Sequence, residues 1–201
     1  MKKVPLSFYD RQDVIQIARE LLGKIIVTNF EGQTTSASIV ETEAYIGFTD
    51  RASHSYRHRR TPCNEHMYSA PGTSYVYICY GIHRMFNIVT NKKEIPDAVL
   101  IRGVEPLEGI AFMAKRTGKK ITDKTLTRGP GNVGKAFGID THHSGLFLLD
   151  KAIFLLDDEK IIAAEKIGIS KRIGVESAGA DSLLPYRFYI KGNQYVSGKR
   201  N

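Results

Sequence analysis

The stretch that decides the fold is residues 73–90, TSYVYICYGIHRMFNIVT. It contains two apolar and aromatic runs, Thr73–Tyr80 and His83–Thr90, which are separated only by Gly81-Ile82. Two such runs with so short a link predict a β-hairpin. Hairpin links join antiparallel strands, so we expect the rest of the chain to extend an antiparallel sheet.

The segments on either side of the hairpin predict more strands than helices. A helix is expected from Asp10 to Leu22, where apolar residues recur at helical spacing before Gly23. Pro106 is expected to open a second helix that runs to Lys115 and is closed by Gly118. Strands are expected at 24–28, 34–45, 98–104 and 186–190 and within 146–156. The predicted fold class is α+β: one domain over residues 1–201, with a curved, antiparallel-rich sheet, a protruding hairpin and surrounding helices.

Three segments show no regular pattern. Residues 47–72 form a long polar stretch rich in Arg and His, and a loop of that length in a compact domain is often functional. Residues 127–139 are glycine-rich and predict a plain turn, although a helix N-terminus that faces a phosphate is an alternative. We expect the tail, residues 197–201, to be frayed.

The composition is that of an ordinary globular protein, with 42% hydrophobic and 25% charged residues. No run of 18 apolar residues occurs, and no apolar stretch follows the basic N-terminus. We therefore expect no membrane span, no signal peptide and a cytoplasmic location. The two cysteines, Cys63 and Cys79, are too few for a disulfide scaffold or a zinc site and are expected to be free thiols.

The net charge of +8 favours a polyanionic partner, and nucleic acid is the commonest. The ten tyrosines support this interpretation because aromatic rings stack on bases. A basic protein without such a partner is the alternative.

Two groups of residues are candidates for chemistry. Glu41 and Glu43 lie two apart near the end of a predicted strand, so their side chains share one face. A carboxylate there can act as a general base on water, or can simply lie on a solvated sheet edge. Tyr80 lies beside the hairpin turn, where a rigid aromatic ring can act as a wedge between base pairs or can belong to the core.

Several segments occur together in an order typical of one family. They are Ala18–Lys24, Ile39–Tyr45, Ala52–Ser55, Pro71–Tyr77, Tyr80-Gly81, Arg102–Gly109 and Arg187–Tyr189. With these segments the chain resembles, over nearly its whole length, the 3-methyladenine (alkyladenine) DNA glycosylase family of the mammalian type, at the length of a bacterial member.

The resemblance implies a monofunctional glycosylase without cofactor or metal. Such an enzyme rotates a damaged purine out of the duplex, hydrolyses its N-glycosidic bond and leaves an abasic site. The implied substrates are 3-methyladenine, 7-methylguanine, hypoxanthine and ethenoadenine. Glu43, rather than Glu41, matches the base that activates water, while Arg102 and the main-chain carbonyl of Ile190 match groups that position it.

The resemblance also implies roles for residues of the base pocket and the wedge. Tyr45 and His54 match one side of the flipped base and Tyr77 the other. Asn87 matches a residue that crowds the 2-amino group of normal guanine. Two positions match side chains that intercalate in the duplex or lie near that site, namely Tyr80 and Met67.

The implied contacts with the DNA backbone are Arg59, Thr61 and Lys135. Cys63 stands where the family usually has arginine, so one phosphate contact is either lost or moved to Arg57, Arg59 or Arg60. Asn132 stands where the family can carry lysine, and Lys135 is a substitute one turn on.

The expected partner is double-stranded DNA that contains damaged purines, with no membrane involved, and the protein is expected to be a monomer. A non-catalytic module for damaged or distorted DNA is the main alternative, since it would need Tyr80 and the basic loop but not Glu43. A metal-dependent hydrolase that uses His54, His58, His66 and His83 is a further alternative.

Overall fold

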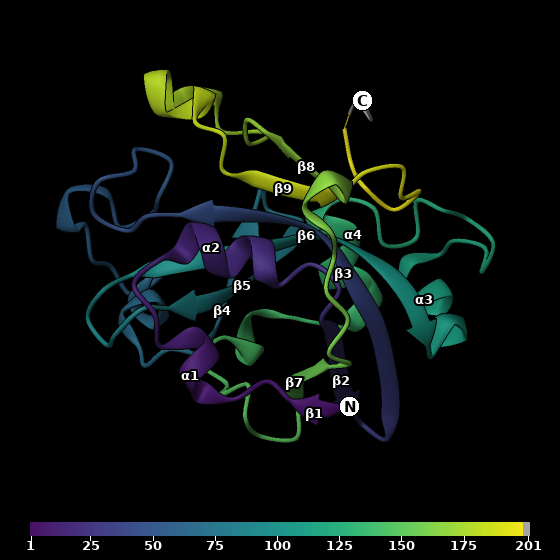
Figure 1. Cartoon of the computed structure of the whole chain (residues 1–201). Coiled ribbons are helices and arrows are strands. Elements are labelled where there is room, and N and C mark those ends of the chain that lie inside the picture. Colours follow the sequence, from purple (N-terminus) through teal and green to yellow (C-terminus); the bar gives the residue numbers. More distant parts are fainter. Residues whose placement is uncertain (199–201) are drawn as a thin grey trace.

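The computed structural model describes residues 1–198 and confirms an α+β fold (Figure 1). A nine-stranded sheet runs in the order β1-β7-β2-β3-β6-β5-β4, and β9 joins it by pairing with both β3 and β8. Every strand pairing is antiparallel. The strands are β1 (Lys2–Lys3), β2 (Ile25–Phe30), β3 (Gln33–Tyr45), β4 (Ser74–Cys79), β5 (His83–Thr90), β6 (Asp97–Glu108), β7 (Ile153–Asp157), β8 (Ile167–Ser170) and β9 (Arg187–Ile190).

Strand β3 is the central strand of the sheet and the one that carries the candidate carboxylates. It is the long dark blue ribbon that curves through Figure 1. Its first half pairs with β2 and its last half with β9, while β6 pairs along most of its length. Because the C-terminal half of β3 has a strand on each side, its backbone is covered and its side chains meet those of β6 and β9.

The helices are α1 (Leu6–Tyr9), α2 (Val14–Glu20), α3 (Ile110–Thr117) and α4 (Pro130–Phe137). Short 3₁₀ turns lie at Tyr56–His58, Glu65–Tyr68, Thr141–His143, Ala164–Lys166 and Glu176–Leu183. The side chain of Asp13 accepts a hydrogen bond from the Gln16 amide and starts α2, which is shorter than the predicted 10–22 helix. Helix α2 buries Val14, Ile17 and Ala18 against the sheet, and the chain turns at Gly23 with a φ of 86°.

The predicted helix start at Pro106 is wrong. Strand β6 runs on through Pro106 to Glu108, and α3 begins only after Gly109, although it ends before Gly118 as expected. Strand β5 pairs only with residues 97–100 of β6. At Pro106 one edge of β6 therefore has no neighbouring strand, and a proline without an N–H is tolerated there.

The plain turn predicted for residues 127–139 is also wrong, because α4 occupies 130–137. Pro130 takes the first helical position, and Gly138 ends the helix in the left-handed conformation. A Cβ on Gly134 would lie 2.2 Å from the carbonyl oxygen of Arg84 in β5. This glycine therefore allows close packing of the helix against the hairpin and does not mark a turn.

The C-terminal tail is not frayed where the structure describes it. Val196 and Ser197 are buried against the sheet. The rest of the predicted frayed segment, residues 199–201, lies outside the described residues. The long stretch 47–72 is a loop as predicted, with two of the 3₁₀ turns inside it.

Candidate active site and DNA-facing surface

Two bulges bring the charged residues of β3 and β6 together. The pairing passes from Ile39↔Val104 to Glu41↔Gly103 and then to Thr42↔Ile101, so Val40 and Arg102 have no direct partner. Bulges re-aim side chains and are frequent next to active sites. Here the Arg102 guanidinium lies between the carboxylates of Glu41 and Glu43, within 3.2 Å of each.

Glu43 has three hydrogen-bond donors around its carboxylate. Its Oε2 accepts from the Tyr45 hydroxyl at 2.8 Å and from Arg102 Nη1 at 3.2 Å. Its Oε1 accepts from the Ile173 amide at 2.8 Å. A carboxylate offers about four acceptor positions. One acceptor position on Glu43 therefore has no donor among the described residues.

Glu41 differs because more donors surround its carboxylate. Its Oε1 accepts from Arg102 Nε, Arg187 Nε and Ser197 Oγ, and its Oε2 accepts from the Ser197 amide. The two neighbouring acids therefore differ in their partners: Glu41 accepts from four donors at the rear of the site, and Glu43 accepts from three, one of them the cavity residue Tyr45.

Burial changes the acid strength of the groups around Glu43. The carboxylate is 0% exposed, and burial raises its pKa, although Arg102, the Ile173 amide and the Tyr45 hydroxyl favour the ionised form. Burial and the neighbouring Glu43 raise the pKa of Tyr45 well above its usual value, so its hydroxyl stays protonated and donates. Burial opposes the charge of Arg102, but Glu43 and Glu41 outweigh it and the net direction of its pKa is upward.

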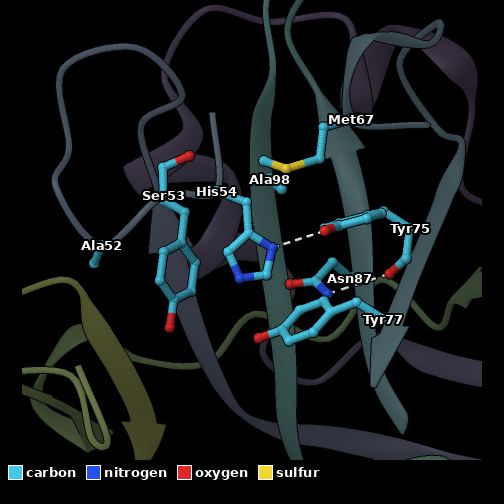
Figure 2. Close-up of a pocket in the computed structure, with 9 residues that line it drawn as sticks. Ala52, Ser53, His54, Met67, Tyr75, Tyr77, Asn87 and Ala98 are labelled. Atoms are coloured by element: carbon cyan, nitrogen blue, oxygen red, sulfur yellow. Dashed lines mark hydrogen bonds between the residues drawn. The ribbon is translucent and has the colours of Figure 1, made fainter. Parts of the chain in front are cut away.

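A cavity lies next to this cluster, on the other side of Tyr45. It encloses about 260 Å³, part of it open to solvent. Its lining residues are Tyr45, Ala52, Ser53, His54, Met67, Tyr75, Tyr77, Asn87 and Ala98 (Figure 2). Glu43 and Arg102 do not line it. The hydroxyl of Tyr45 links the cavity wall to the buried carboxylate.

Aromatic side chains form one wall of the cavity. The Nδ1 atom of His54 lies 2.7 Å from the hydroxyl of Tyr75, and the His54 ring meets the Tyr77 ring edge to face, with centroids 4.4 Å apart (Figure 2). Partial desolvation, together with Arg59, lowers the pKa of His54 and favours the neutral ring. Asn87 donates to the main-chain oxygens of Tyr75 and Met85, which fixes its amide at the cavity.

The hairpin between β4 and β5 projects its turn into solvent. Tyr80 and Gly81 have φ angles of 50° and 74°, and the Ile82 amide donates to the Cys79 carbonyl. Positive φ at both central residues is typical of a type I′ turn. Tyr80 is 86% exposed and stands between two other exposed apolar side chains, Ile78 and Ile82.

The structure places Met67 in a buried cluster, and its intercalating role stays a prediction. Met67 is 2% exposed and packs with Tyr68, Tyr75, Val89 and Ala98. Met67 also lines the cavity (Figure 2).

The predicted DNA-backbone residues lie in two hollows. Arg59 and Thr61 line one, together with β4 residues and the exposed Cys63. Lys135 lines the other with Lys119, Asn132 and residues 82–84 of the hairpin.

Cys63 stands where the family usually has an arginine, and Arg60 is one of the residues expected to take over that phosphate contact. In the structure, Arg60 is bound to acidic side chains. Its guanidinium binds Glu65 and Glu94 in salt bridges at 2.5 Å and covers the Tyr68 ring. Asn132, the second departure from the family pattern, accepts from Lys119 Nζ at 3.0 Å and so holds a lysine at this hollow.

Sequence reasoning missed several partners of the site. Arg187, Ser197 and Arg172 are buried at its rear, and Arg187 gave a signal only as part of the family-like segment 187–189. Arg172 binds both carboxylate oxygens of Asp50 and covers the ring of Tyr45 at 4.7 Å. This ion pair joins the loop after β3 to the segment that supplies the Ile173 amide to Glu43.

Ile190 is not brought to the cavity. It ends β9 and packs against the core, and its carbonyl accepts from the Asn193 amide at 3.3 Å. Three of the four histidines that suggested a metal have separate partners. His54 binds Tyr75, His58 stacks on Phe48 and His66 binds Ser144.

Residues 1–198 contain neither a metal-binding cluster nor a membrane-spanning helix. No cluster of three His, Cys, Asp or Glu side chains is placed to hold a metal ion there. No helix in this part of the chain has the length and hydropathy to cross a membrane.

Comparison with known proteins shows the family of this chain. Residues 7–194 match a family model described as Methylpurine-DNA glycosylase (MPG). A relative from Desulfitobacterium hafniense (strain Y51), named "Putative 3-methyladenine DNA glycosylase", is 43% identical over 99% of this chain and 100% of its own length. A relative of the same name from Clostridium perfringens (strain 13 / Type A) is 42% identical over 96% of this chain and 98% of its own. The chain therefore belongs to the methylpurine-DNA glycosylase family, and it is a DNA-repair glycosylase that hydrolyses N-glycosyl bonds.

Proposed function

We propose that the protein flips damaged purines, among them 3-methyladenine, 7-methylguanine, hypoxanthine and ethenoadenine, out of duplex DNA and releases them with a water activated by Glu43. The water oxygen bonds to C1′ of the deoxyribose as the bond from C1′ to the purine nitrogen breaks. The electron pair of that bond leaves with the purine, and the proton of the water passes to Glu43. The product is an abasic site, without strand cleavage.

The observation that carries the proposal is the contrast between the two acids. Glu41 accepts from four donors at the rear of the site, whereas Glu43 accepts from three and is bonded to Tyr45, which lines the cavity. Its raised pKa makes Glu43 a stronger base than an ordinary glutamate, and Arg102 keeps its charge oriented. As the purine departs, the carboxylate also stabilises the oxocarbenium-like sugar.

The base would bind in the aromatic cavity. Alkylated purines are electron-poor, and such rings stack well on tyrosine and histidine. The edge-to-face contact of His54 and Tyr77 leaves no slot for a base between them, so binding requires one of these rings to turn. A protonated Tyr75 can donate to Nδ1 of neutral His54, which would leave its Nε2–H as a donor to the purine edge.

Glu43 is fully covered, so the arrival of the nucleotide must also open a path for water. Tyr45 is the side chain that separates the carboxylate from the cavity. Asn87, held by two main-chain oxygens, would crowd the 2-amino group of guanine. Tyr80, at the exposed tip, would fill the gap in the stack after flipping.

The test is base release from duplex oligonucleotides that each carry one hypoxanthine, ethenoadenine, 3-methyladenine or 7-methylguanine, in excess chelator. Alkali converts abasic sites to strand breaks. Breaks with the wild type, and none with Glu43→Gln although the variant still binds the lesion, are the expected result. Lesion binding without breaks by the wild type would replace the proposal with a non-catalytic binding module. Activity lost only in chelator would point to a metal-dependent hydrolase.

A further inference from the structure

Ser197, in the segment after β9, completes the buried charge cluster. Its Oγ donates to Glu41 Oε1 at 2.8 Å and accepts from Arg102 Nη2 at 3.3 Å. Its amide donates to Glu41 Oε2 at 2.7 Å. Ser197 thus contacts both Glu41 and Arg102, the arginine that binds Glu43.

The segment that carries Ser197 packs against the sheet. Val196 is buried with Val40 and Tyr189. A Cβ on Gly103 would lie 2.7 Å from the carbonyl oxygen of Tyr195, so only glycine at this position of β6 lets the segment lie so close. The position of Ser197 is therefore fixed by packing on two strands.

Arg102 is fixed at three points by this arrangement. Its Nε binds Glu41, its Nη1 binds Glu43 and its Nη2 binds Ser197. A guanidinium is a rigid planar fork, and three acceptors around it set both its position and its tilt. Loss of the Ser197 hydroxyl would leave Nη2 buried without that acceptor and would let the fork tilt away from Glu43.

We propose that Ser197 and Glu41 are positioning residues of the glycosylase, which act by fixing the Arg102 guanidinium against Glu43. The proposal rests on the function proposed above for Glu43 and Arg102. The family match ends at residue 194, before Ser197.

The charged surroundings of Glu43 give this proposal a second readout. Titratable and charged groups face or adjoin Glu43 from every element packed around it: Glu41 and Tyr45 on β3, Arg102 on β6, Arg187 on β9, Tyr77 on β4 and Arg172 beside Ile173. Among them, the negative charge of Glu41 raises the pKa of Glu43. The charge of Arg102 lowers the pKa of Glu43 by more than Glu41 raises it, so a guanidinium that tilts away from Glu43 raises that pKa and moves the acid limb of the reaction to higher pH.

The first test compares Ser197→Ala, Ser197→Thr and the control Ser182→Ala. Ser182 loses a hydroxyl bonded to the Gly179 carbonyl, away from the cluster. Single-turnover base release from a hypoxanthine duplex is measured at saturating enzyme and normalised to the active fraction. The Kd for the same duplex is measured in a Glu43→Gln background.

We expect Ser197→Ala to be about tenfold slower, as for a lost hydrogen bond to a charged group, with its Kd unchanged. Ser197→Thr keeps the hydroxyl and should recover most of the rate, and Ser182→Ala should match the wild type. A Ser197→Ala rate equal to that of the wild type would overturn the proposal. So would a slower rate accompanied by an equal loss of binding, since that pattern indicates general disruption.

The second test is the pH profile of Glu41→Gln. We expect a slower reaction whose acid limb lies at higher pH than in the wild type, because the released Arg102 no longer lowers the pKa of Glu43. A structural defect lowers the active fraction but leaves the limb in place, and loss of the Glu41 charge alone moves the limb to lower pH, so either of these results would count against the positioning role. If the wild type itself releases no base, the proposed function fails. That outcome is distinct from a failure of the positioning role, in which the wild type is active and the Ser197 or Glu41 variant does not behave as expected.

Discussion

The hydroxyl of Tyr45 connects the aromatic cavity to the buried carboxylate of Glu43. Tyr45→Phe keeps the ring and removes the 2.8 Å hydrogen bond to Glu43 Oε2. A hydrogen bond to a charged group contributes about 1.5–3 kcal/mol. Since about 1.4 kcal/mol corresponds to tenfold in rate, the reaction should slow by roughly 10- to 100-fold if the bond persists in the transition state.

The pH profile adds a directional prediction. The hydrogen bond from the Tyr45 hydroxyl lowers the pKa of Glu43, while burial raises that pKa by a larger amount. Loss of the hydroxyl must therefore raise the pKa of Glu43 again. Because the carboxylate form is the active base, the acid limb of the Tyr45→Phe profile should lie at higher pH than that of the wild type.

The assay is single-turnover base release from a hypoxanthine duplex across the acid range, with lesion binding measured in parallel. Tyr77→Phe is the matched comparison, since it removes a hydroxyl from the same cavity without a bond to Glu43, and its acid limb should stay in place. A Tyr45→Phe enzyme with the wild-type rate and an unmoved limb would refute the link between the cavity and Glu43. Reduced lesion binding with an unmoved limb would show that Tyr45 serves only to stack on the base.

Three further predictions follow from other parts of the structure. Tyr80→Ser should weaken flipping, and its single-turnover rate on duplex DNA should fall much more than on a single strand; equal losses on both would remove the wedge role. Lesion binding should weaken steeply as salt rises, because Lys and Arg displace counterions from phosphates, and a flat dependence in a titration would contradict a phosphate-based interface. Asp50→Asn leaves Arg172 buried without its charge partner, so the free energy of unfolding should fall by about 3–5 kcal/mol in urea titrations. A loss below about 1 kcal/mol would show that Asp50 is not the partner that stabilises Arg172.

The elements that local pattern decides could be predicted from sequence. The hairpin follows from two alternating runs around a link with glycine, and α2 follows from its apolar spacing and the stop at Gly23. Glu41 and Glu43 were expected on one face, and both do contact Arg102. In each case residues close in sequence determine the outcome.

The remaining features depend on contacts between segments distant in sequence. Pro106 lies in a strand because β5 ends its pairing earlier, and Gly134 lies in a helix because that helix packs against β5. Glu41 accepts hydrogen bonds from Arg187 and Ser197, which are 146 and 156 residues away in the sequence. No periodicity or motif in the sequence indicates such convergence, so the chemical difference between Glu41 and Glu43 becomes visible only in the fold.

Glu43, with its raised pKa, is proposed as the general base that activates the water. The most direct measurement is the pH dependence of single-turnover base release for the wild type and Glu43→Gln, side by side on one hypoxanthine duplex. The wild-type rate should rise with pH along an acid limb above the ordinary glutamate value of 4.5, while the variant should retain only a small residual rate without that limb. A Glu43→Gln enzyme that keeps the wild-type rate, or the same acid limb, would contradict the account.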